Sequence, residues 1–178
     1  MDHIVHLHDL PIAKTGDCLL VYEKTLTLSD GTAYADGDNL GELLEISNAT
    51  NEVDGTGEIL SFELIEYAPS GETLQKPGME IYFQKTTFTS GDDNAAFSLT
   101  TPSDYTDVIG IPAAITATTD YTEVAGTNKF AVARKALNVK FQNRSDTTLY
   151  ARLIATGAPN FDITAGVRLI VRILIQRN

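Results

Sequence analysis

The stretch Val167-Arg-Leu-Ile-Val-Arg-Ile-Leu-Ile175 decides the fold of this chain. Its alternate positions place five aliphatic side chains on one face, as a β-strand with one face in a hydrophobic core requires. The opposite face combines arginine with aliphatic residues, which is unusual for a surface that meets only water. We therefore expect a core strand at residues 167–175 whose second face contacts another element or a partner through Arg168, Ile170, Arg172 and Leu174.

The same alternation recurs upstream in residues 58–67, where Leu60, Phe62 and Leu64 share one face, and in residues 79–84. Repeated Asp-Gly, Ser-Gly and Pro-Gly pairs separate such segments and favour tight turns. This is the pattern of antiparallel sheets with one face in the core and one in water. Further strands are expected at residues 22–28, 41–47, 96–99, 129–141 and 148–155.

Within residues 129–141 the apolar positions change parity. Phe130 and Val132 share one parity, whereas Leu137 and Phe141 share the other. A bulge or bend near residues 134–136 would let both sets face the core. We therefore predict an irregularity in this strand.

One short helix is expected near residues 102–108, because a threonine, a proline and an acidic residue follow one another at its start. The whole pattern predicts an all-β protein, an antiparallel β-sandwich that is jelly-roll-like and has about eight to ten strands. Residues 19–178 form this single domain. Residues 1–18 precede it as an N-terminal arm or first strand.

Charge is distributed unevenly along the chain. Residues 129–178 hold nine of the 13 basic residues and only two of the 24 acidic ones. The net charge of −11 argues against nucleic acid as a partner. We expect the acidic part to face water and the basic C-terminal strands to lie in or near a protein–protein interface, with Arg152 as a further interface residue.

Few residues are suited to metal binding or catalysis. The three histidines are His3, His6 and His8, and on a strand His6 and His8 would share a face, as metal ligands do. We favour an arm that faces water or docks on a partner, since chain ends rarely preorganise a site. We expect no metal.

The motifs of nucleotide binding, serine hydrolysis and zinc proteases do not occur in the sequence. Paired carboxylates on neighbouring strands are the enzymatic alternative that the sequence leaves open. We expect no enzyme activity, no catalytic residues and no cofactor.

The start of the chain lacks a basic segment followed by a long apolar run, which predicts a protein made in the cytoplasm without a secretion signal. The apolar stretch at residues 167–175 is too short and too charged to cross a membrane. No membrane partner is expected.

Five stretches form an ordered series along the chain. They are Gly31–Gly41 (GTAYADGDNLG), Gly57–Ser61 (GEILS), Met79–Phe83 (MEIYF), Asp93–Leu99 (DNAAFSL) and Thr147–Pro159 (TTLYARLIATGAP). This series resembles a group of small tailed-bacteriophage virion proteins that decorate or cement the capsid, over most of residues 20–175. The resemblance implies a jelly-roll-like sandwich that binds the major capsid protein on the outer shell as a dimer or trimer and stabilises that shell. It implies no catalytic residues and gives the histidine arm no role.

The expected function is therefore that of a structural virion protein on the capsid surface. The alternative is a tail, baseplate or host-attachment protein, which would share the β-rich, threonine-rich composition. A small-ligand or carbohydrate-binding jelly roll is less favoured. Such sites stack sugars on exposed aromatic rings, and the chain has no tryptophan.

Overall fold

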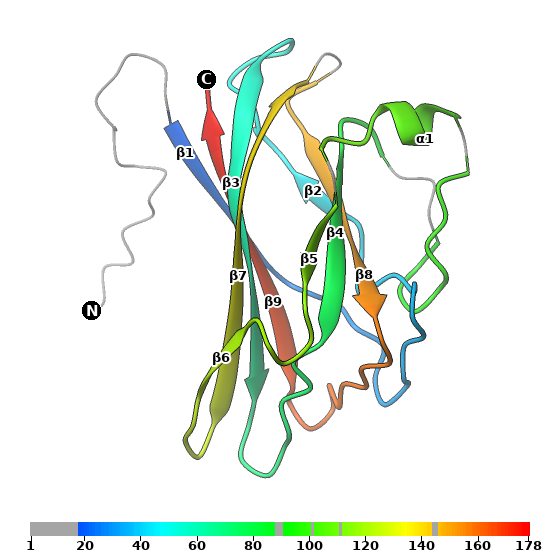
Figure 1. The fold of residues 1–178 in the computed structure, drawn as a ribbon, viewed down its shortest axis with the longest axis vertical. Coiled ribbons are helices and arrows are strands. Elements are labelled where there is room, and N and C mark those ends of the chain that lie inside the picture. The colour runs from blue at the N-terminus through cyan, green and yellow to red at the C-terminus, as the bar shows by residue number, and fades with distance from the viewer. Residues whose placement is uncertain (1–17, 88–90, 101, 111, 144–145) are drawn as a thin grey trace.

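The computed structural model describes residues 18–87, 91–100, 102–110, 112–143 and 146–178. Within these ranges the protein has nine β-strands in two antiparallel sheets and one five-residue helix (Figure 1). The expected all-β antiparallel sandwich is confirmed, and its jelly-roll connectivity stays a prediction. The expected arm, apart from the strand residue Cys18, lies outside the described residues, and so do its candidate metal ligands His3, His6 and His8.

Neighbouring strands of each sheet come from distant parts of the sequence. The five-stranded sheet has the order β1 (Cys18–Thr25), β9 (Arg168–Arg177), β3 (Thr56–Ala68), β7 (Lys129–Gln142) and β6 (Tyr121–Val124). The four-stranded sheet has the order β2 (Leu44–Ile46), β8 (Leu149–Thr156), β4 (Gly78–Gln84) and β5 (Ala113–Ile115). Figure 1 shows the first sheet on the left and the second on the right.

The hydrophobic core fills the space between the two sheets. Every second residue of β9 points into it, as the opening stretch predicted, and these residues are Leu169, Val171, Ile173 and Ile175. Burying one such aliphatic side chain stabilises a fold by about 1.5–3 kcal/mol. This burial determines which face of β9 turns inward and leaves the arginine-bearing face outside.

β3 departs from regular alternation at Leu60. Its pairing with β7 and β9 shifts between Ile59 and Ser61, so the strand contains a β-bulge there. Phe62 and Leu64 are fully buried, as predicted, but Leu60 is only partly buried. The prediction for Leu60 was wrong because the extra residue of a bulge reverses the parity on either side of it.

In β7 the odd-numbered residues are the more buried ones along the whole strand. Its pairing with β3 nevertheless contains a bulge, because Leu137 and Asn138 stand opposite the single residue Leu60, and Asn138 has a positive φ of 54°. Ala131, Ala133 and Phe141 point toward the core. Phe130, which is 40% exposed, and Val132 lie on the opposite face of the sheet. The predicted irregularity in this strand is present, but it lies at residues 137–138 instead of 134–136, and it does not turn Phe130 and Val132 toward the core. Small alanines occupy the inward positions, and the larger side chains at 130 and 132 face out of the sandwich.

The helix α1 (Pro102–Thr106) confirms the expected short helix and lies at the upper right of Figure 1. The Asp104 carboxylate accepts a hydrogen bond from the backbone N–H of Thr100 (3.0 Å), which stabilises the first turn. The helix is shorter than expected because Val108 already pairs with Gln84 in a β-bridge.

Three further segments differ from the sequence prediction. Residues 96–99 form no strand, and only Ala96 makes a β-bridge, with Asp38. The strands β5 and β6 were not predicted. They contain three and four residues, which is too short for a periodic pattern to stand out.

Candidate interaction surface

The outer face is the side of the five-stranded sheet that points away from the core. It carries four of the five predicted interface residues, which are Arg168, Ile170, Arg172 and Leu174 at alternating positions of β9. β9 lies between β1 and β3, so these side chains stand within the sheet and not at its edge. The structure therefore brings the four together in one line along this face.

A row of alternating charges crosses the outer face at right angles to the strands. The charge row is Glu23 on β1, Arg172 on β9, Glu63 on β3 and Arg134 on β7, each directly opposite the next in the strand pairing. The Arg172 guanidinium donates hydrogen bonds to Glu23 (2.7 and 2.9 Å) and to Glu63 (2.9 Å). Arg134 forms an ion pair with Glu63 at 3.4 Å.

These carboxylates raise the pKa of the Arg172 guanidinium, mainly through its hydrogen bond with Glu23. The side chains of Arg172 and Arg134 remain 40% and 61% exposed. Exposed ion pairs of this kind contribute only about 0–1 kcal/mol each to folding. The charge row thus adds little to stability, but it gives the outer face a definite electrostatic pattern.

Apolar side chains lie on either side of the charge row. On one side is the isoleucine row, which consists of Thr25, Ile170, Ile65 and Val132 in successive strands. On the other side is the leucine row, which consists of Val21, Leu174, Ser61 and Ala136. Apart from Thr25 and the buried Ser61 (5% exposed), these residues are apolar, and a sheet face with two such rows is a candidate for contact with another protein.

Beyond the isoleucine row the outer face continues with Arg168, Tyr67, Phe130 and Val124. Phe130 and Val124 are 40% and 46% exposed. The Arg168 guanidinium donates hydrogen bonds to the carbonyls of Val167 (2.7 Å) and Ile163 (3.0 Å), which hold this side chain near the start of β9.

The fifth predicted interface residue, Arg152, does not lie on the outer face. It is only 5% exposed, and its guanidinium donates to the carbonyls of Gly41 (2.9 Å) and Gly91 (3.1 Å). Burial lowers the pKa of Arg152, and the nearby carboxylate of Asp92 opposes that shift. Arg152 therefore works inside the fold, where it ties two loops together, and its expected role at an interface is corrected.

Arg152 belongs to a unit, the bracket, built from residues 37–41, 91–97 and 152–155. Backbone hydrogen bonds join these segments, such as Leu40 N–H to the Leu153 carbonyl (2.9 Å) and Phe97 N–H to the Gly37 carbonyl (2.9 Å). The Asp93 carboxylate accepts hydrogen bonds from the Tyr34 hydroxyl (2.8 Å) and the Gly41 N–H (2.6 Å). The bracket contains parts of three stretches of the series quoted from the sequence.

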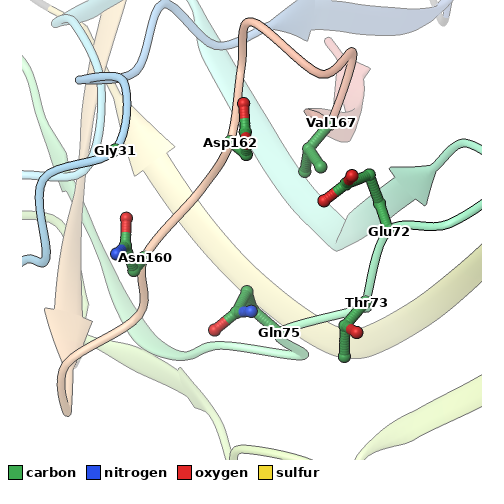
Figure 2. Close-up of a pocket in the computed structure, with 7 residues that line it drawn as sticks. All are labelled: Gly31, Glu72, Thr73, Gln75, Asn160, Asp162 and Val167. Carbon is green, nitrogen blue, oxygen red and sulfur yellow. The ribbon is translucent and has the colours of Figure 1, made fainter.

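A polar hollow of about 210 Å³ lies between the loop after β3 and the segment before β9 (Figure 2). Glu72 and Gln75 line it from the first segment, and Asn160 and Asp162 from the second. A wider, open hollow of about 530 Å³ lies beside Glu58, Lys140 and Gln176. Neither has the mainly apolar lining that small-molecule sites usually show.

In the described part of the chain, no three His, Cys, Asp or Glu side chains stand together in a way that could hold a metal ion. Over the same residues, no helix is both long and apolar enough to cross a membrane.

Sequence reasoning found the β9 side of the outer face but missed Glu23, Glu63 and Arg134. Glu63 lies on the parity that the alternation of its strand assigned to water, but Arg134 shares its parity with Phe130 and Val132, which were expected to face the core. The signal for their alignment was absent, because the register between strands distant in sequence follows from the fold and not from local pattern.

No protein-family model matches the chain, and no curated protein is similar to it.

Proposed function

We propose that this chain is a structural virion protein that binds the major capsid protein on the outer surface of a tailed-phage capsid and stabilises the shell. One observation carries the proposal. Three of the five stretches behind the resemblance to capsid-decorating proteins, widely separated in the sequence, contribute to a single hydrogen-bonded unit, the bracket. Proteins that share such a folding unit are expected to share its sequence stretches in the same order.

The surface charge also supports this function. The outer face carries three acidic residues (Glu23, Glu58, Glu63) and four basic ones (Arg134, Lys140, Arg168, Arg172), although the whole chain has a net charge of −11. The negative charge is therefore concentrated on the remaining surfaces. A protein displayed at high density on a particle benefits from such a surface, because self-repulsion and hydration keep it soluble.

Binding to empty, expanded capsids from the parent phage tests the proposal. We expect the purified protein to co-sediment with these capsids, to saturate at a fixed number of copies per particle, and to raise the temperature at which the capsids disrupt. Labelled protein should be displaced by an excess of unlabelled protein, as binding to a limited set of sites requires.

A parallel measurement uses intact host cells. Adsorption to cells together with competition against infecting phage, without capsid binding, would replace the proposal with host attachment. Failure to bind either capsids or cells would remove the proposed role on the capsid surface.

A further inference from the structure

The charge row has an order with a consequence for symmetry. Across the sheet it reads Glu23, Arg172, Glu63, Arg134, so its second half repeats the first. When such a row is turned end for end, every acidic residue meets a basic one. A surface that complements its own rotated copy is the requirement for a two-fold symmetric dimer.

From this order we infer that the outer face binds the outer face of a second copy, about a two-fold axis that runs in the interface along the strands between β9 and β3. Each chain then places Glu23 against Arg134 of the other and Arg172 against Glu63 of the other. Four ion pairs form across the interface. The inference concerns the isolated protein in solution and does not depend on capsid binding.

The other in-plane two-fold axis, perpendicular to the strands, gives the opposite result. It would place each strand against its own copy, so that Glu23 would meet Glu23 and Arg172 would meet Arg172. Like charges across an interface oppose association and select against that arrangement. The charge row therefore distinguishes between the two symmetric ways of stacking the same pair of sheets.

The apolar rows fit the same axis. A rotation about the strand direction keeps each row at its own height, so the isoleucine row meets itself and the leucine row meets itself. Ile170 of one chain then lies against Ile65 of the other, and Arg168 lies over Tyr67 of the other, where a cation can interact with the aromatic ring. Two aligned sheets stacked in this way pack about 10 Å apart, as in sandwich proteins.

The size of the outer face suits a stable dimer. Its four long strands are about 4.8 Å apart, and β1 and β9 contain eight and ten residues, so the face spans roughly 500–600 Å² in projection. The accessible area of a side-chain surface exceeds its projection, which brings it near the ~800 Å² that each partner contributes to a standard interface. The near balance of charge on this face also makes it the surface where two chains of charge −11 repel each other least.

The test inverts the charge row with four substitutions together: Glu23→Arg, Arg172→Glu, Glu63→Arg and Arg134→Glu. The inverted chain keeps its net charge, and each residue keeps an oppositely charged neighbour within the sheet. Its composition is unchanged, so wild type must be labelled with ¹⁵N to be told apart by native mass spectrometry. We expect wild type and inverted chain each to form homodimers in analytical ultracentrifugation and to form no mixed dimer after joint dilution and reconcentration.

Each other outcome overturns the inference. Mixed dimers formed in preference to homodimers would indicate the perpendicular axis, and free mixing would show that the charge row lies outside the interface. A wild-type chain that stays monomeric up to its highest soluble concentration would show that the outer face does not bind itself.

A single substitution tests the proposed dimer independently, in case the inverted chain does not fold. Val132→Lys places an ammonium in the isoleucine row, where it would face Thr25 of the other chain without a charged partner, and should weaken dimerisation at least about 100-fold, because burying an unpaired charge is costly. Val53→Lys is the matched control, since Val53 is 54% exposed in a turn away from the outer face. Equal dimerisation of the two folded variants would contradict the inference.

Discussion

At the scale of single residues, two buried charged side chains hold loops in place. Arg152 binds the carbonyls of Gly41 and Gly91 with one planar guanidinium. Glu66, which is fully buried, accepts hydrogen bonds from the backbone N–H groups of Gln75 (2.7 Å) and Lys76 (2.6 Å). Both residues stand in strands and fasten a neighbouring irregular segment to its sheet.

Removing the Arg152 side chain should destabilise the fold. Arg152→Ala leaves the Gly41 carbonyl without its side-chain donor, whereas the Gly91 carbonyl keeps a hydrogen bond from the Asn39 amide (3.0 Å). An unsatisfied buried acceptor costs about 1–3 kcal/mol, so we expect a decrease of that size in the free energy of unfolding. Lys24→Ala is the control. Its ammonium is exposed and pairs with Glu42, so its loss should cost less than about 1 kcal/mol. Urea unfolding measures both, and equal losses would contradict the internal role of Arg152.

The buried Glu66 carboxyl predicts a pH dependence. Burial raises its pKa above the ordinary value of 4.5, against the opposing effect of the two backbone hydrogen bonds and Lys76; the nearby Glu123 raises it further. Because the folded state holds this proton more tightly than the unfolded chain does, the contribution of Glu66 is largest below 4.5 and is lost as the pH rises through the folded-state pKa.

The comparison variant is Glu66→Gln, which should be less stable than wild type by about 1–3 kcal/mol, since its amide NH₂ faces a backbone donor. We expect this difference to shrink as the pH rises above 4.5 and through the raised folded-state pKa of Glu66. Urea unfolding of both proteins across that range provides the measurement. A difference that grows with pH would mean that the backbone donors outweigh burial and lower the pKa.

At the scale of elements, β7 shows how far sequence reasoning reaches. The fold class, the opening strand β9 and the short helix followed from periodicity and capping residues. The orientation of Phe130 and Val132 did not, because the prediction assumed that large apolar residues face the core. The structure fills the inward positions with Ala131 and Ala133 instead. Apolar residues on both faces of a strand cannot be assigned from the strand alone; their assignment depends on the neighbouring strands.

Two phenylalanines of β7 provide a test of this orientation. Phe141 is 6% exposed and Phe130 is 40% exposed. Phe141→Ser should lower the free energy of unfolding by about 3–5 kcal/mol, as large-to-small changes in a core do, whereas Phe130→Ser should cost about 1 kcal/mol or less. Urea unfolding at low protein concentration keeps self-association out of the comparison. Similar losses for the two variants would contradict this orientation.

At the scale of the whole molecule, the places of the five residues predicted for an interface followed from the sequence only in part. Four of them lie on the outer face, because the alternation of β9 is regular. Arg152 does not, because its side chain is hydrogen-bonded within the bracket. Changing both Arg168 and Arg172 to glutamate would test the charge of this face poorly. It would also break the contacts that Arg172 makes with Glu23 and Glu63 within the chain. Inverting the complete charge row separates association from folding, since it preserves these contacts.

The pairing of β1 with β9 has a consequence for the order in which the protein is made. β1 is synthesised before β2 to β8, yet its sheet neighbour β9 is synthesised only after all of them. β1 and β3 therefore stay without the strand that lies between them until β9 has emerged. Arg172 arrives with β9, so the charge row is completed only at that moment. Nascent chains on neighbouring ribosomes thus lack the surface with which finished molecules would recognise one another.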